Sequence, residues 1–168
     1  PHGVTPDPSG RFLLAPDMGA DRMFVHAIDA PSALQGRMAE ALAFPAGSGP
    51  RLVRFRPDGR FAYLLTELSA QVFVLRVNDP GHLEQVQVLA LDPPDHEGEP
   101  SAAAFAMSAD GRHLYASNRR TNAIHTFAID PISGLLDPVQ TIASGGARPW
   151  CAALSPDGTF VLVCNQAS

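Results

Sequence analysis

The sequence lacks the features that mark disulfide-rich, membrane-spanning and nucleic-acid-binding proteins. It holds 2 cysteines in 168 residues, too few for the disulfide framework of a small secreted domain. No apolar run approaches the roughly 20 residues that span a bilayer, and no signal-like segment opens the chain. With 12 basic against 17 acidic residues, it has no basic field for nucleic acid or anionic lipid. We therefore expect a cytoplasmic protein with no nucleic-acid and no membrane partner.

The two cysteines are placed symmetrically about one turn. Cys151 and Cys164 flank residues 156–159 at equal distance, so they should lie opposite each other on paired strands. A bridge between adjacent strands is geometrically awkward. We therefore expect two buried, reduced thiols.

Proline and glycine, by contrast, are abundant, at 16 and 14 residues, which predicts many short elements joined by turns. One turn motif recurs four times, with its glycine at Gly10, Gly59, Gly111 and Gly158. The spacings of 49, 52 and 47 residues indicate a duplicated unit.

Each unit has the pattern of four β-strands, with alternating or β-branched apolar residues. In the second unit they are residues 51–56, 61–65, 71–77 and 83–89, and in the third 103–107, 113–117, 123–129 and 139–142. Four antiparallel strands in 40 to 50 residues predict an all-β fold, a β-propeller. The blades would be residues 1–48, 49–100 and 101–147, with a half blade at 148–168.

Two segments need a separate interpretation. Residues 31–42 have the pattern of a short amphipathic helix, but their register with 83–89 favours a loop and an outer strand. Residues 92–100 are expected to be an acidic, exposed loop between blades.

About three and a half blades would form an open arc with bare apolar faces and sheet edges. We therefore expect this chain to be the C-terminal part of a longer protein, or to associate with a second chain. The opening Pro1-His2-Gly3 points to the first alternative.

The antiparallel strand directions bring the start of each first strand and the end of each second strand to one rim. The polar residues there are His2, Arg51, Glu67, Asn118, Arg119, Arg148 or Trp150, and Asn165. An acid, a histidine and several arginines at one opening suit a small anionic ligand with acid–base assistance.

Glu67 is the most informative of these residues, because the equivalent positions hold Met18, Arg119 and Gln166 and the fold does not require an acid there. Asn118 and Asn165 have an alternative role as turn formers.

Other polar residues suggest no additional site. The repeated Arg11, Arg60 and Arg112 follow the turn glycine and should be solvated at the opposite rim. The remaining histidines have no spacing that suits a metal, and they are His26, His82, His96, His113 and His125. We predict no metal and no cofactor.

Several motifs together resemble those of the lactonase family of seven-bladed propellers. They are the repeated turn with residues 1–4, residues 49–51 with Glu67-Leu68, and residues 117–119. That family includes bacterial 6-phosphogluconolactonases and fungal carboxy-muconate cyclases. The resemblance covers essentially the whole chain, and implies that roughly the N-terminal half of a seven-bladed propeller is absent.

The resemblance places the family's catalytic residues on Glu67, His2 and Arg51, with Asn118 and Arg119 nearby. Arg148 and Asn165 complete the expected substrate-binding set. An arginine would bind a phosphate or polarise the lactone carbonyl, and either Glu67 or His2 would activate water.

Four apolar residues depart from the family pattern. Leu52 stands where histidine is usual in the family, and Ala104 where an acid is usual. Ala106 stands where a basic residue or histidine is usual, and Trp150 where arginine is usual. Three hypotheses therefore stand: a sugar-lactone hydrolase, a muconate-type cyclase, and a propeller that binds a small molecule without turnover.

Overall fold

The computed structural model describes residues 1–28, 37–79, 81–95 and 97–167. The strands in chain order are β1 (Thr5–Pro6), β2 (Phe12–Asp17), β3 (Arg22–Ala27), β4 (Arg37–Ala43), β5 (Pro50–Phe55), β6 (Phe61–Thr66), β7 (Gln71–Asp79), β8 (His82–Ala90), β9 (Ala102–Met107), β10 (His113–Asn118), β11 (Ala123–Ile129), β12 (Leu136–Ala143), β13 (Ala147–Leu154) and β14 (Val161–Ala167). Within these ranges there is no helix, and so none that could cross a membrane. The expected all-β fold is confirmed.

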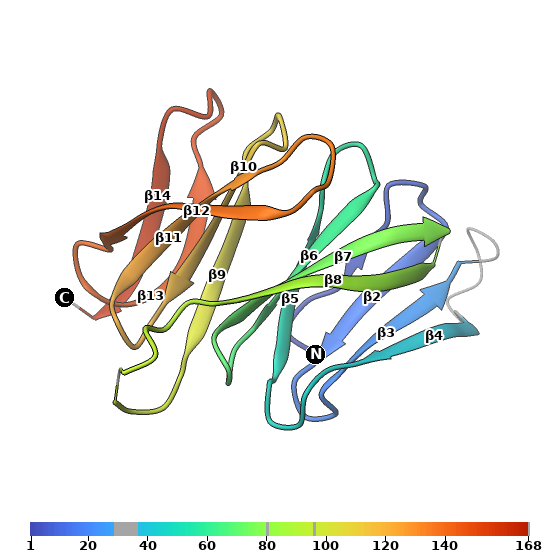
Figure 1. The fold of residues 1–168 in the computed structure, drawn as a ribbon, viewed down its shortest axis with the longest axis horizontal. Coiled ribbons are helices and arrows are strands. Elements are labelled where there is room, and N and C mark those ends of the chain that lie inside the picture. The colour runs from blue at the N-terminus through green and yellow to red at the C-terminus, as the bar shows by residue number, and fades with distance from the viewer. Residues whose placement is uncertain (29–36, 80, 96, 168) are drawn as a thin grey trace.

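The strands form four antiparallel sheets that follow the repeat. Three sheets have four strands each, in the orders β1-β2-β3-β4, β5-β6-β7-β8 and β9-β10-β11-β12, and β13 pairs with β14. Figure 1 shows the sheets side by side in chain order, from blue to red. The first strands β5 and β9 contact each other, as do β9 and β13. This is the blade arrangement of a β-propeller. Only β13 crosses an expected unit boundary, beginning one residue before 148.

The recurring glycine produces the hairpin between the first two strands of each unit. Gly10, Gly59, Gly111 and Gly158 have φ values of 70°, 73°, 67° and 72°, a left-handed conformation that favours glycine. Each glycine N–H donates to the carbonyl three residues earlier, at 2.8–2.9 Å. The motif is therefore conformational, and the arginine after it is solvent-exposed at Arg11, Arg60 and Arg112, as expected.

The core lies in two layers, one on each face of the second sheet. Leu64 and Phe73 belong to the layer shared with the first sheet, whereas Tyr63 and Leu65 belong to the layer shared with the third. As a result, β6 is buried along its whole length. In the described part of the chain the fourth sheet has no such cover, and Leu162 on β14 and Phe160 just before it are 58% and 64% exposed.

The prediction of buried thiols is wrong. Cys151 and Cys164 are directly opposite in register, as expected, and both are free, but they are exposed. The reason is that β13 and β14 are the only strands of their sheet in the described part of the chain, and one face of the pair is left open.

The two separately interpreted segments differ in outcome. Residues 37–43 form the outer strand β4 as expected, while the rest of 31–42 lies outside the described residues. The loop at 92–100 is not exposed throughout, because Asp92 is drawn inward by an ion pair with Arg120 at 2.7 Å.

Candidate active site

The residues at the rim come from two positions of the repeat. Eight residues before the turn glycines are His2, Arg51, Ala103 and Trp150, and eight residues after them are Met18, Glu67, Arg119 and Gln166. Both positions lie at the end of a hairpin that is opposite its turn. Side chains from successive blades therefore meet at the same rim.

Two of these side chains, Arg51 and Trp150, each lie at a β-bulge. Pro50 pairs with Thr66 and Leu52 with Leu65, so Arg51 is the extra residue of β5. Trp150 is likewise the extra residue between the pairs that β13 makes with β14. Bulges of this kind reorient a side chain where a strand approaches a site.

Glu67 lies at the centre of the rim and binds two arginines from different blades. Arg51 Nη1 donates to Glu67 Oε2, and Arg119 Nη2 donates to Oε1. Each guanidinium is also anchored through Nε, that of Arg51 to the Ala103 carbonyl at 3.1 Å and that of Arg119 to Ser101 Oγ at 2.9 Å. Both arginines are buried, at 7% exposure, so the geometry is held from several sides.

The charge balance of this arrangement favours an anion. Burial alone would raise the pKa of Glu67, but the hydrogen bond from Arg119 and the positive charges of Arg51 and Arg119 outweigh it and hold the pKa below its ordinary value. Glu67 is therefore ionised at neutral pH. One carboxylate against two guanidinium groups leaves a formal surplus of one positive charge.

His2 and Trp150 form the open side of the site. His2 Nε2 lies 3.9 Å from Glu67 Oε2, with its side chain 42% exposed. The Trp150 ring lies 4.5 Å from Arg119 Cζ and 5.6 Å from Arg51 Cζ, within the range of cation–π attraction. We call Glu67, Arg51, Arg119, His2 and Trp150 the Glu67 cluster.

Three expected binding residues do not contact this cluster in the interactions that the structure shows. The Asn118 side chain is fully buried and donates to Asp92 Oδ1 at 2.7 Å, while its own oxygen accepts two backbone N–H bonds. Asn165 donates to the Ser144 carbonyl at 3.1 Å. Arg148 is exposed. Their substrate-binding roles stay predictions, whereas the structure brings His2, Arg51, Glu67 and Arg119 together.

Sequence reasoning gave Trp150 only as an alternative to Arg148 and as a departure from the family pattern. The signal that would have placed it was present, because Trp150 has the same position relative to the turn glycine as Arg51 and His2. Ser101, which anchors Arg119, has no comparable signal.

A hollow of about 250 Å³ lies beside the Glu67 cluster, against the first strands of three blades. Its walls are Arg51, Leu52, Arg54, Ala103, Ala104, Phe105, Trp150, Cys151 and Ala152. Three of the four apolar departures, Leu52, Ala104 and Trp150, therefore line one space. They make it less polar without removing the arginines.

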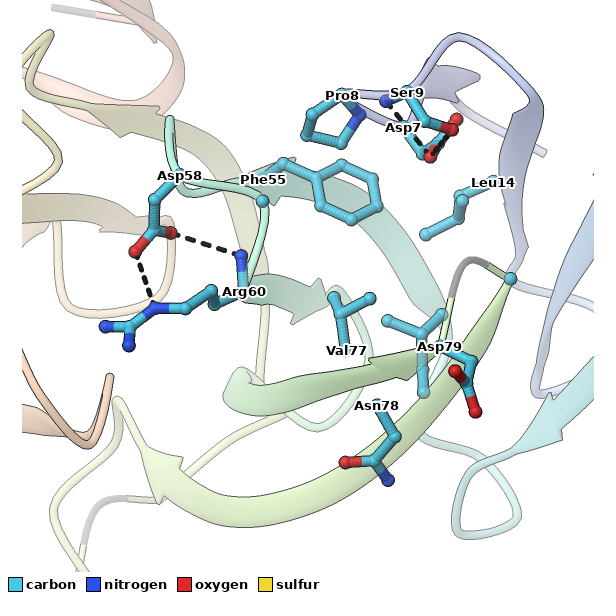
Figure 2. Close-up of a pocket in the computed structure, with 13 residues that line it drawn as sticks. Asp7, Pro8, Ser9, Leu14, Phe55, Asp58, Arg60, Val77, Asn78 and Asp79 are labelled. Atoms are coloured by element: carbon cyan, nitrogen blue, oxygen red, sulfur yellow. Dashed lines mark hydrogen bonds and ion pairs between the residues drawn. The ribbon is translucent and has the colours of Figure 1, made fainter.

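A second hollow, of about 280 Å³, lies between the first two blades at the turn end of the hairpins. Figure 2 shows its apolar wall and the acids around it, with Asp7 bonded to Ser9 and Asp58 to Arg60. Asp7 and Asp58 are occupied in their own turns. Among the described residues no three His, Cys, Asp or Glu side chains are placed to hold a metal ion. We therefore place the candidate site at the Glu67 cluster.

Blades of four antiparallel strands define a β-propeller, and the charged cluster at their rim is its candidate functional site. More specifically, the chain belongs to the lactonase, 7-bladed beta-propeller family, whose model matches residues 1–168.

Solved structures and curated relatives agree with this assignment. The chain is 44% identical to the periplasmic gluconolactonase PpgL of Pseudomonas aeruginosa, with a TM-score of 0.93 over 98% of this chain and 47% of that one. A putative 6-phosphogluconolactonase from Bacteroides uniformis is 34% identical, with a TM-score of 0.88 over 98% and 47%.

The 6-phosphogluconolactonase of Bacillus subtilis is 29% identical over 167 residues, which are 98% of this chain and 46% of that protein. The chain thus spans about half the length of the relatives it matches.

Proposed function

We propose that the protein of which this chain forms part hydrolyses a sugar lactone. The observation that carries the proposal is the Glu67 cluster, an ionised acid held by two buried arginines beside a half-exposed histidine. The names of the relatives, 6-phosphogluconolactonase and gluconolactonase, support a sugar lactone as the substrate.

His2 is the better candidate for the general base. Both oxygens of Glu67 already accept hydrogen bonds from arginines, and its lowered pKa makes it a weak proton acceptor. His2 is open to water and close enough for Glu67 to stabilise the charge that it gains. Glu67 then orients the two arginines.

The reaction proceeds by addition and elimination at the lactone carbonyl. Water adds to the carbonyl carbon while His2 accepts a water proton, and the oxyanion is stabilised by remaining N–H groups of Arg51 or Arg119. The bond between the carbonyl carbon and the ring oxygen then breaks. The proton held by His2 passes to that oxygen, which leaves as a hydroxyl, and the product is an open-chain acid. These steps use side chains and water, so the proposal names no cofactor.

Two further expectations belong to the whole protein. We propose that the open blade faces around Phe160 and Leu162 are covered by the remaining blades of a seven-bladed propeller, or by a second chain. A cytoplasmic location stays a prediction, and one relative is named as periplasmic.

The test is lactone hydrolysis by the full-length protein, measured as acid release at constant pH and corrected for spontaneous hydrolysis. We expect His2→Ala to lower kcat by about 10²- to 10⁴-fold. His113→Ala, at the opposite end of β10 from the rim, is the matched control and should retain activity. Full activity of the double variant His2→Ala/Glu67→Gln would contradict the mechanism.

Two other outcomes would replace the proposal. Turnover of a muconate, followed by its ultraviolet absorbance, would favour the cyclase. A ligand that raises Tm without any turnover would favour a binding propeller, for which the apolar Leu52, Ala104 and Trp150 in the hollow are the structural argument.

A further inference from the structure

Arg54 differs from the other arginines that the fold encloses. Five arginines in the described part of the chain have buried or half-buried side chains, and four of them contact a carboxylate. Those four are Arg51 and Arg119 with Glu67, Arg56 with Asp58, and Arg120 with Asp92. The only hydrogen bond shown for Arg54 runs from Nη1 to the carbonyl of its neighbour Val53, at 3.0 Å.

Such a cation is costly to keep in the structure. Burial disfavours the charged form and lowers the pKa of Arg54, yet a guanidinium stays protonated in proteins. A half-buried charge without a counter-ion is stabilised when an anion binds to it. The open position near Arg54 is therefore suited to a negative group that the described residues do not supply.

The position of Arg54 indicates which molecule would supply that group. Arg54 lines the same hollow as Arg51 and Trp150, so it shares a space with the Glu67 cluster. Arg51 and Arg54 are three residues apart on β5, which places their backbones about 10 Å apart at most. That separation is comparable to the length of a six-carbon chain with a phosphate at its far end. Ala103, Ala104 and Ala152 keep the space between them open.

We propose that Arg54 binds a terminal phosphate of the substrate, so that the hollow selects a phosphorylated sugar lactone over a neutral one. The inference rests on the proposed function, because it assumes that the lactone carbonyl lies at the Glu67 cluster. The planar guanidinium can donate to two phosphate oxygens at once. A neutral hydroxyl at the same place offers only one oxygen and no charge.

The experiment compares two substrates in the full-length protein, 6-phosphogluconolactone and gluconolactone. Arg54→Met keeps much of the apolar stem and removes the charge. It should lower kcat/KM for the phosphorylated lactone by about 10- to 100-fold while leaving that for the neutral lactone within about 3-fold. Arg54→Lys should recover part of the loss. Arg112→Met, an exposed arginine at the opposite rim, should affect neither substrate.

A second measurement separates this inference from the proposed function. If the wild-type protein hydrolyses neither lactone, the proposed function fails, and binding of 6-phosphogluconate and gluconate is then compared through Tm. A larger Tm increase with 6-phosphogluconate, absent in Arg54→Met, still supports the phosphate site. Equal losses on both lactones, or a lower Tm of the variant without any change in substrate preference, would overturn it and assign Arg54 to a structural contact.

Discussion

At the scale of single residues, the Glu67 carboxylate sets the charge balance and the arginine orientation at the rim. It neutralises one of two buried guanidinium groups and fixes the direction of both. Neither arginine has another acid partner among the ion pairs shown for the described residues, so removal of the Glu67 charge leaves two buried cations uncompensated. The same carboxylate therefore contributes to stability as well as to the proposed chemistry.

Glu67→Gln should lower the free energy of unfolding by about 1 to 3 kcal/mol at pH 7. Because the folded-state pKa of Glu67 is lowered, its contribution is present above the unfolded value, about 4.3, and is lost as the pH falls through the folded value. Urea unfolding measured from pH 7 to pH 3 should show that the difference in the free energy of unfolding between wild type and variant disappears below about pH 4.

The control for this experiment is Glu84→Gln. Glu84 pairs with Arg76 at 3.7 Å, and both side chains are about half exposed, so its loss should change the free energy of unfolding by less than about 0.5 kcal/mol. If the loss in free energy of unfolding caused by Glu67→Gln did not depend on pH, the carboxylate charge would not be the source of the stabilisation.

At the scale of elements, the loop between β11 and β12 of the third blade packs against β6 of the second blade. Gly134 in this loop has φ of 70°, and a Cβ there would overlap the Phe61 ring. Its carbonyl accepts a hydrogen bond from the buried Tyr63 hydroxyl at 2.9 Å. The close approach of this loop to β6 thus depends on the absence of a side chain.

Gly134→Ala should therefore lower the free energy of unfolding by more than the cost of placing alanine in a left-handed conformation. Gly145 is the matched control, because its φ is 74° and a Cβ there would meet nothing within 4 Å. We expect about 1 kcal/mol for Gly145→Ala from the left-handed conformation, and about 1 to 3 kcal/mol more for Gly134→Ala from the overlap. Chemical unfolding measures both, and equal losses would mean that Phe61 moves aside at no cost.

At the scale of the whole molecule, burial is uneven along the arc of blades. The second blade is covered on both faces, whereas the fourth sheet exposes Leu162 on β14 and Phe160 just before that strand. Exposed apolar side chains on an edge strand favour association with other chains. The relatives, about twice as long, are consistent with cover from further blades.

The 168-residue chain alone should therefore self-associate, and Phe160→Ser/Leu162→Ser should reduce this association. Ile132→Ser is the control, because Ile132 is 81% exposed but lies in a loop. Light scattering after size-exclusion chromatography over a range of concentrations gives the molecular mass. A wild-type chain that stays monomeric at every concentration would contradict the expectation.

The sequence by itself determined the strands, the turns and the repeat. These follow from local rules: alternation along a strand, left-handed glycines such as Gly59, and a constant spacing between units. The same spacing was enough to bring the polar side chains of the Glu67 cluster to one rim. His2 and Arg51 lie eight residues before a turn glycine, and Glu67 and Arg119 lie eight residues after one.

Only the tertiary structure decided which of these side chains touch. Glu67 and Arg119 are 52 residues apart, and their contact depends on how two blades pack. The same packing brings the Trp150 ring close to the two arginines and turns Asn118 inward. It gives Arg54 no acid partner among the described residues. It also leaves Cys151 and Cys164 exposed, although their register was predicted correctly. Pairing within a hairpin depends on neighbours in sequence, whereas burial and charge compensation depend on what the next blade supplies.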